Sequence, residues 1–196
     1  MNIDKTVDKG VTGGVFSPAA IVLRGDGEPL DNAAYIEKLS SLSSRSPIAQ
    51  DNYSLGGSVA ELEESMARML GKESAVFMPT GTLANHLAVR KLCQGYSRAI
   101  VQEQGHLYRD SGDTIQQLSG INLVPLGVGS PCFTYKEVQR AIEDSLNGRV
   151  PTQIGTLVIE SPVRRCHGQV MTFKEMQQIT QLCQENSNRR NISRLE

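Results

Sequence analysis

Apolar residues recur at two different spacings along the chain, and the spacing changes several times. Short apolar runs occupy residues 74–78 (SAVFM), 98–102 (RAIVQ), 121–126 (INLVPL) and 156–160 (TLVIE). Runs of this length between polar segments are typical of buried strands. Around them, apolar residues recur every three or four positions, which predicts helices near 59–70, 82–93, 108–118, 135–146 and 173–185. Strands that alternate with helices predict an α/β fold with a mostly parallel sheet and flanking helices.

The two ends of the chain lack this alternation. The lead contains GVTGG, RGDGEPLDN and SSLSSRSP, which are rich in turn-forming residues, with one helix expected near 32–41. After the last helix the polar segment NSNRRNISRLE stands where a further strand is expected. The sequence therefore predicts a loop-rich arm with a short helix over residues 1–52, a partial α/β large domain over 53–186, and an irregular polar tail over 187–196.

One helix is expected to begin differently from the others. Three helices open with a capping-box pattern, in which Ser or Thr is followed three residues later by Glu: Ser58 to Glu61, Thr134 to Glu137 and Thr172 to Glu175. The helix after the first strand instead begins Thr80, Gly81, Thr82, with no acid in its first turn. Such a helix start can bind an anion. An ordinary N-cap by Thr82, with Gly81 in a turn, explains the same residues.

Polar segments follow three of the predicted strands. In parallel sheets, ligands bind beyond the carboxyl ends of the strands. Residues 79–82, 103–106 and 160–165 all follow strands and are expected to meet at one edge. They bring His106, Arg164 and Arg165 to that edge, where an arginine can bind a carboxylate through two parallel bonds. A packed or solvated histidine and a solvated arginine pair are the alternatives.

The composition excludes several functions. The net charge is -1, tryptophan is absent and aromatic residues make up 5% of the chain, so we expect no nucleic-acid partner. No apolar run is long enough to cross a membrane, and the first residues lack a signal-peptide pattern, so we expect a cytoplasmic protein. The widely spaced cysteines, Cys93, Cys132, Cys166 and Cys183, match neither a zinc site nor a disulfide framework. No nucleotide-binding glycine motif is present, which favours a small phosphate ester over ATP or NAD.

Three segments together resemble a known family. They are KESAVFMPTGTLANHLAVRKL, EQGHLYRDSGDTIQQLSGINLVPL and VIESPVRRCHGQVMTFKEMQQI. In order and spacing they are similar to the threonine aldolase and β-eliminating lyase group of pyridoxal-phosphate enzymes. The resemblance runs from about Asp51 to Glu185 and implies the large domain of the aspartate aminotransferase-like fold, also called fold type I, incomplete at its C-terminal end.

The resemblance also implies roles for individual residues. Thr80, Gly81 and Thr82 match the loop that binds the phosphate of pyridoxal 5'-phosphate. His106 matches the histidine that stacks on the pyridine ring and assists proton transfer. Arg165 matches an arginine near the cofactor and the substrate carboxylate.

Substrate binding is implied for two residues of the lead segments. Tyr53 lies in DNYSLGGSVAELE, which resembles the segment whose tyrosine reaches the active site. Asp26 lies in RGDGEPL, where the family usually has Arg-Ser-Asp and where this chain lacks the serine hydroxyl. Ser161 and the pair Val163–Arg164 also depart from the usual residues, which weakens the case for threonine itself as the substrate.

Two residues that the family chemistry needs are not found. They are an aspartate under the pyridine nitrogen, in an Asp-Gly-Ala-Arg type motif, and a later lysine that forms the Schiff base. Four lysines, Lys72, Lys91, Lys136 and Lys174, fall on predicted helices or their ends, away from the ligand edge. We therefore expect this chain alone to be inactive.

Three hypotheses follow. The first is the N-terminal part of a truncated carbon–carbon lyase that, in its complete homo-oligomeric form (dimer or tetramer), converts a β-hydroxy amino acid to glycine and an aldehyde. The second is a degenerate, non-catalytic homologue that binds phosphate ligands or pairs with a complete paralogue. The third is an unrelated α/β module that binds anions.

Overall fold

The computed structural model describes residues 30–46, 48–53 and 55–190. The chain divides into a helical unit, Met1–Ala75, and a sheet unit, Val76–Glu196. We describe each unit by itself. Asp26, expected at the substrate, lies outside the described residues.

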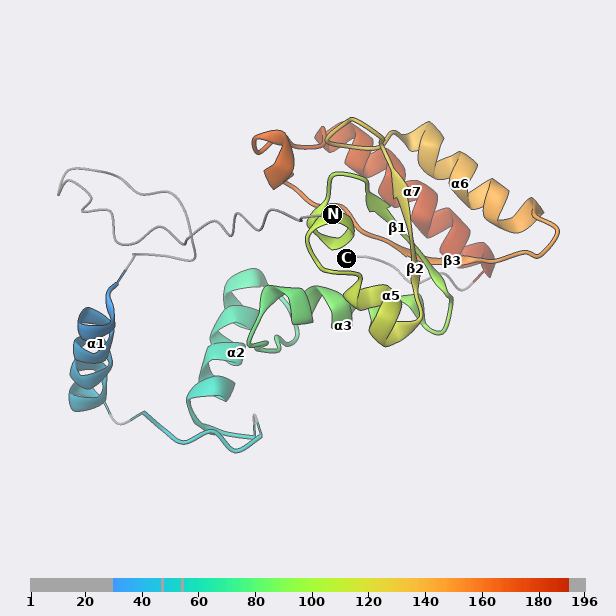
Figure 1. Ribbon diagram of the computed structural model, residues 1–196. Helices are drawn as coiled ribbons and strands as arrows, with labels where there is room; N and C mark the ends of the chain where they lie inside the picture. The colour runs from blue at the N-terminus through green and yellow to red at the C-terminus, as the bar shows by residue number, and fades with distance from the viewer. Residues whose placement is uncertain (1–29, 47, 54, 191–196) are drawn as a thin grey trace, which may run out of the picture. The chain divides into compact units, whose positions relative to one another are not determined.

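Two helices form the described part of the helical unit (Figure 1). Helix α1 (Asn32–Arg45) begins where the Asp31 carboxylate accepts the backbone N–H of Ala34 at 2.8 Å, and it continues beyond the end expected at residue 41. Helix α2 (Gly57–Leu70) ends at Gly71, which adopts the left-handed conformation with φ 63°. An αL glycine satisfies the last carbonyls of a helix, and a glycine directly after the apolar stripe of residues 59–70 predicts this helix end from the sequence alone.

The capping box expected at Ser58 is wrong. Helix α2 has Gly56 as its N-cap and no side-chain cap hydrogen bond, so Ser58 already lies in the first turn. The start moves toward the N-terminus because two glycines allow an unusual approach to the helix. Gly57 has φ 83°, and a Cβ atom there would lie 2.2 Å from the carbonyl oxygen of Gln50. Only glycine fits this position.

The sheet unit contains a three-stranded parallel sheet in the order β2-β1-β3. Strand β1 (Arg98–Gln102) occupies the predicted residues, and β2 (Asn122–Leu126) begins one residue later than predicted. Strand β3 (Ile154–Leu157) begins and ends earlier than the predicted run 156–160. A register shift after Arg98 interrupts the pairing of β1 with β3.

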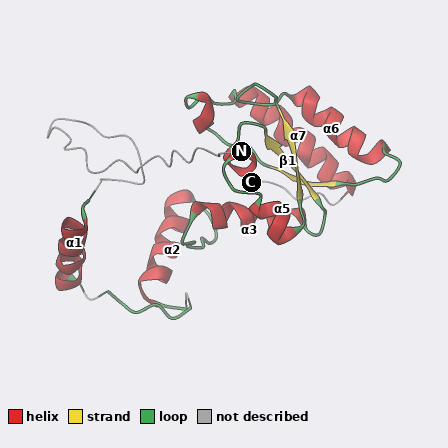
Figure 2. Ribbon diagram, viewed as in Figure 1, coloured by secondary structure: helices red, strands yellow, loops and turns green. Residues whose placement is uncertain are grey.

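The strand predicted over residues 74–78 is wrong. Figure 2 draws the chain between α2 and α3 as loop, and Val76 and Phe77 are 69% and 53% exposed. An apolar run indicates that its residues favour burial, but a strand also needs a neighbouring strand to accept and donate its backbone hydrogen bonds. In the described residues, β1 pairs only with β2 and β3. The run 74–78 therefore remains a loop that leads into the next helix.

The described part of the sheet unit also contains five helices and one 3₁₀ turn: α3 (Gly81–Cys93), α4 (His106–Arg109), α5 (Thr114–Ser119), α6 (Tyr135–Asn147), the turn η1 (Arg164–Cys166) and α7 (Phe173–Arg190). The single helix expected over 108–118 is divided into α4 and α5. Gly112 and Asp113 both have positive φ, 61° and 56°, which a continuous helix cannot contain. Helix α7 continues past the end expected near Glu185.

Successive residues of β1 point to opposite faces of the sheet and build two cores. Ile100 packs with residues of α6 and α7, including Val138, Ile142 and Ile179. Ala99 and Val101 pack with residues of α3 and α5 on the other face. Figure 1 shows α6 and α7 side by side, with α3 and α5 apart from them. The result is the α/β arrangement predicted from the sequence. Polar residues follow the carboxyl ends of β1 and β3 at one edge of the sheet.

The starts of two helices agree with the sequence predictions. Helix α6 has the complete capping box of Thr134 and Glu137, and Thr172 accepts the Glu175 N–H at 3.3 Å before α7. None of the four cysteines, all of which lie within the described residues, forms a disulfide. Burial raises the pKa of Cys93 and of Cys183 to about 11, so neither is a reactive thiolate at neutral pH.

Candidate functional site

A buried glutamine joins the carboxyl ends of β1 and β3. Gln102, the last residue of β1, is 2% exposed. Its side-chain amide accepts the backbone N–H of Glu160 and donates to the Glu160 carbonyl at 3.0 Å, and it also donates to the Pro131 carbonyl at 2.9 Å. The amide thus replaces strand pairing three residues after β3 has ended. It fixes the backbone of Glu160 beside the end of β1.

The side chain of Glu160 connects two segments that the sequence places at this edge. Its carboxylate accepts the backbone N–H of His106, the first residue of α4, and the backbone N–H of Arg164 at 3.3 Å. Gly105 permits this approach, because a Cβ there would lie 3.2 Å from the Glu160 carboxylate. One carboxylate therefore holds the start of α4 against the start of η1.

A second carboxylate closes the connection from the other end of α4. Asp110 follows α4, and its backbone N–H donates to the His106 carbonyl at 2.8 Å. Its carboxylate accepts two bonds from Arg165 Nε at 3.1 Å and one from a terminal nitrogen of Arg165 at 2.6 Å. Arg164 contributes a further contact at 3.6 Å. The hydrogen bonds from Arg165 hold the pKa of Asp110 below its ordinary value, so the pair is ionised at neutral pH.

His106 and Arg165, both predicted as site residues, therefore lie at one edge of the sheet, connected through Glu160 and Asp110. The predicted meeting of residues 103–106 and 160–165 is confirmed, but residues 79–82 follow a loop and not a strand, because the strand predicted over 74–78 is wrong. His106 is half-buried and the side chain of Arg165 is 46% exposed, so both are accessible from solvent. Nearby, the buried carboxylate of Glu103 pairs with Arg109, which fixes the chain directly before His106.

The predicted phosphate loop begins helix α3. Thr80, not Thr82, is the N-cap, and its hydroxyl accepts the Leu83 N–H at 3.1 Å. No acid lies in the first turn, and a Cβ at Gly81 would meet no atom within 4 Å. The helix start is thus open and keeps its partial positive charge. Among the described residues, no hydrogen bond joins Thr80, Gly81 or Thr82 to His106 or Arg165.

The remaining histidines and Tyr53 have other surroundings. His86 is buried and its Nε2 lies 2.6 Å from the Ser119 hydroxyl, which gives this histidine a structural role. His167 is exposed, with φ 55°. Tyr53 is 91% exposed and belongs to the helical unit, so its role at the substrate stays a prediction.

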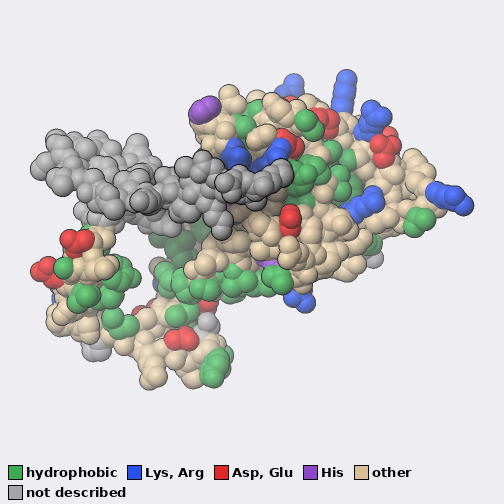
Figure 3. Space-filling model, viewed as in Figure 1, with side chains coloured by type: hydrophobic (Ala, Val, Ile, Leu, Met, Phe, Trp, Pro, Cys, Tyr) green, Lys and Arg blue, Asp and Glu red, His purple; other side chains and the backbone are tan. Residues whose placement is uncertain are grey.

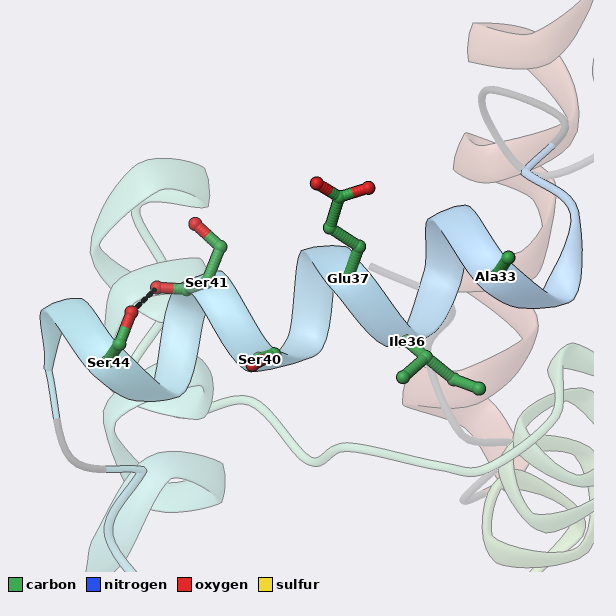
Figure 4. Close-up of a pocket in the computed structure, with 6 residues that line it drawn as sticks. All are labelled: Ala33, Ile36, Glu37, Ser40, Ser41 and Ser44. Carbon is green, nitrogen blue, oxygen red and sulfur yellow. Dashed lines mark hydrogen bonds between the residues drawn. The ribbon is translucent and has the colours of Figure 1, made fainter.

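Other surfaces offer weaker sites. A shallow depression on α1 is lined by Ala33, Ile36, Glu37, Ser40, Ser41 and Ser44 (Figure 4). All six belong to one helix, so the depression does not enclose a ligand. Figure 3 shows charged side chains of both signs scattered over the visible face of the sheet unit, with no continuous basic surface. Within the described ranges, no group of acidic, histidine or cysteine side chains is arranged to hold a metal ion, and no helix is long and apolar enough to cross a membrane.

The fold is α/β, and the candidate site lies beyond the carboxyl ends of parallel strands. Residues 35–189 match the beta-eliminating lyase family, and the chain belongs to this family.

Curated relatives include the low specificity L-threonine aldolase of Escherichia coli K12, which is 33% identical over 88 residues, covering 45% of this chain and 25% of that protein. The low specificity L-threonine aldolase of Saccharomyces cerevisiae is 28% identical over 130 residues, covering 64% of this chain and 32% of that protein. The chain thus spans about a quarter to a third of the length of these two relatives.

Solved structures show the same fold. A putative L-allo-threonine aldolase from Listeria monocytogenes has a TM-score of 0.68 and 27% identity, and the match covers 83% of this chain and 43% of that protein. A putative aromatic amino acid beta-eliminating lyase/threonine aldolase from Exiguobacterium has a TM-score of 0.67 and 24% identity, with the same coverage. The aspartate aminotransferase-like fold predicted from the sequence is confirmed for the part that this chain contains.

Sequence reasoning missed the residues that join the site. Gln102, Asp110 and Glu160 are polar residues at or just after the ends of elements, and the sequence offered that signal for Gln102 and Glu160, which close the runs RAIVQ and TLVIE. Asp110 had no such signal, because the single helix predicted over 108–118 places it inside an element, whereas α4 ends at Arg109.

Proposed function

We propose that this chain carries part of the cofactor and substrate site of a pyridoxal-phosphate-dependent carbon–carbon lyase of the threonine aldolase type. The observation that carries the proposal is the meeting of His106 and Arg165 at the carboxyl edge of a parallel sheet, each held by a carboxylate. Family membership supports the reaction class, and the threonine aldolase relatives support a β-hydroxy amino acid as the substrate class.

The residues present fit a phosphorylated pyridine. The start of α3 offers backbone N–H groups and the Thr80 hydroxyl without a competing acid, which suits a phosphate group. The His106 ring is accessible beside the sheet edge, where it can stack on a planar ring. The guanidinium of Arg165 offers paired N–H donors to a carboxylate or another anion. When bound, pyridoxal phosphate supplies the electron sink that makes cleavage next to the α-carbon possible.

Each residue then has a separate task. The α3 start holds the phosphate and fixes the position of the ring. His106 covers one face of the ring and moves a proton at its imidazole nitrogen. Arg165 orients the substrate through its carboxylate, and Tyr53 and Asp26 are further substrate contacts that we propose from the resemblance alone. A homo-oligomer and a cytoplasmic location stay predictions from the sequence.

The lysines of the sheet unit favour a second candidate, a non-catalytic homologue that binds phosphate ligands. Lys91, Lys136 and Lys174 lie on α3, α6 and α7, and all three are exposed. None directly follows a strand of the sheet. We therefore propose that the 196-residue chain binds pyridoxal phosphate without forming a covalent adduct and does not cleave substrate by itself.

A titration of the purified chain with pyridoxal phosphate tests both candidates. Binding is followed by absorbance and by equilibrium dialysis, and borohydride reduction with peptide mapping detects any lysine adduct. We expect saturable binding that inorganic phosphate competes away, and no reduced lysine. A trapped lysine would instead show that the chain is catalytically more complete than proposed.

Variants assign the binding to the edge site. His106→Asn should weaken pyridoxal phosphate binding about tenfold, because it removes the stacking surface. His167→Asn is the matched control, since Asn tolerates the left-handed backbone of His167 and this side chain is exposed. Equal affinities for the two variants, or no phosphate-dependent binding by the unmodified chain, would refute the proposed site.

A further inference from the structure

We propose that Asp110 is a positioning residue for Arg165: its carboxylate fixes the guanidinium beside His106 so that the remaining N–H groups face an incoming anion. The inference deepens the proposed function, in which Arg165 binds the carboxylate of the substrate or an anionic group of the cofactor. It assigns the task of orienting Arg165 to Asp110, a side chain that contacts neither the substrate nor the cofactor.

Asp110 binds one edge of the Arg165 guanidinium and leaves the other unbound. Asp110 accepts bonds from Nε and from Nη2, so it uses one edge of the planar group. An arginine has five N–H donors, and among the described residues none accepts from Nη1. The end of the guanidinium that carries Nη1 is thus available for a second anion while the first edge stays bound.

Burial indicates that Asp110 supports the arginines and not the reverse. The Asp110 side chain is 19% exposed, whereas those of Arg165 and Arg164 are 46% and 79% exposed. The carboxylate lies behind the two arginines, and the arginines face solvent. The carboxylates of Asp110 and Glu160 balance the two guanidinium charges, so the attraction for an additional anion comes from the guanidinium N–H groups that Asp110 does not bind.

The protein also fixes Asp110 relative to His106. The Asp110 N–H donates to the His106 carbonyl, and the His106 N–H donates to Glu160, whose carboxylate also accepts from Arg164. Hydrogen bonds therefore form a closed ring from His106 through Asp110 and the arginine turn back to His106. A guanidinium attached to this ring is held relative to the backbone of His106, whereas a free arginine has many rotamers.

The test compares Asp110→Asn with Asp144→Asn. Asp144 is the matched control, because it pairs with Arg140 at 3.6 Å on the exposed face of α6. The first readout is exchange of the Arg165 Nε–H with water, measured by ¹H–¹⁵N NMR and assigned by loss of the signal in Arg165→Lys. The second readout is the Kd for pyridoxal phosphate.

We expect Asp110→Asn to speed Nε–H exchange about tenfold and to raise the Kd about fivefold, the effect of losing one charge-assisted bond. Asp144→Asn should change neither. Unchanged exchange in Asp110→Asn would overturn the inference, and so would a lower Kd, because it would show that Asp110 competes with the ligand. If Asp110→Asn does not fold, acid titration of the unmodified chain replaces it. The Nε–H protection should then persist below the ordinary pKa of an aspartate, since Arg165 lowers the pKa of Asp110, and loss within the ordinary range would refute the pairing.

The two proposals fail separately. If the unmodified chain does not bind pyridoxal phosphate, the proposed function is wrong, whereas the Nε–H exchange still decides whether Asp110 holds Arg165.

Discussion

Replacing Gln102 by methionine should destabilise the sheet unit and weaken its site together. Methionine has nearly the same volume and removes only the amide. Its loss leaves three backbone groups without their partner: the N–H and carbonyl of Glu160 and the carbonyl of Pro131. Buried unsatisfied groups cost about 1–3 kcal/mol each. Glu160 and Pro131 are half-buried, so water reaches them in part, and we expect a total loss of about 3 kcal/mol at the low end of that range.

Urea denaturation followed by circular dichroism measures this free energy of unfolding. With a slope of about 2 kcal/mol/M, the midpoint of Gln102→Met should fall by about 1.5 M. Gln139→Met is the control, because among the described residues the half-buried Gln139 side chain donates only to Glu143 of the same helix, at 2.9 Å. It should change the free energy by less than about 0.5 kcal/mol. A Gln102→Met variant as stable as this control would refute the argument that the amide joins β1 to residue 160. Its affinity for pyridoxal phosphate should also fall, since Glu160 positions the start of α4.

Three further predictions concern the sheet unit. Gly155→Ala should destabilise the protein by about 1–3 kcal/mol in urea denaturation, since the added Cβ would lie 2.8 Å from the backbone of Cys93 and overpacking costs this much; an unchanged midpoint would contradict the tight contact. Thr134→Ala should lower the free energy of unfolding by about 1 kcal/mol in the same assay, because it removes the N-cap of α6. A loss below about 0.3 kcal/mol, the size of one side-chain pair on an exposed helix, would show the cap to be unimportant. Burial raises the pKa of Glu137, but hydrogen bonds from Thr134 outweigh it and hold the pKa below its ordinary value. The stabilisation by the Glu137 carboxylate is therefore present above the pKa of the unfolded chain and is lost as the pH falls through the pKa of the folded protein. Glu137→Gln should thus be less stable than the unmodified chain at neutral pH and equally stable in acid. A stability difference that is constant with pH would refute this.

The sequence determined the elements that depend on local signals. The run RAIVQ became β1 without any shift, because its apolar residues serve both faces of the sheet and polar segments bound it. The capping box at Thr134 and the glycine after α2 were also predicted correctly, since a cap needs only residues within one turn. His106 and Arg165 were placed at one edge by a rule about parallel sheets that needs only the order of the elements.

Local signals failed where a distant partner decides. Residues 74–78 have the composition of a strand, yet the described residues give them no neighbouring strand. The helix expected over 108–118 breaks because Gly112 and Asp113 adopt positive φ, although the letters DSGD already indicate a turn.

The tertiary structure alone decided how the site is held. Nothing in the sequence pairs Asp110 with Arg165, or Gln102 with Glu160, across 55 and 58 positions. Hydrophobic periodicity reports which face of an element is buried, so it can bring two elements to the same edge. It does not report which carboxylate meets which donor there, because that depends on the strand order β2-β1-β3 and on where each strand ends. The sequence by itself therefore identified the family and brought His106 and Arg165 to one edge of the sheet, and the tertiary structure decided which acids and which amide hold them there.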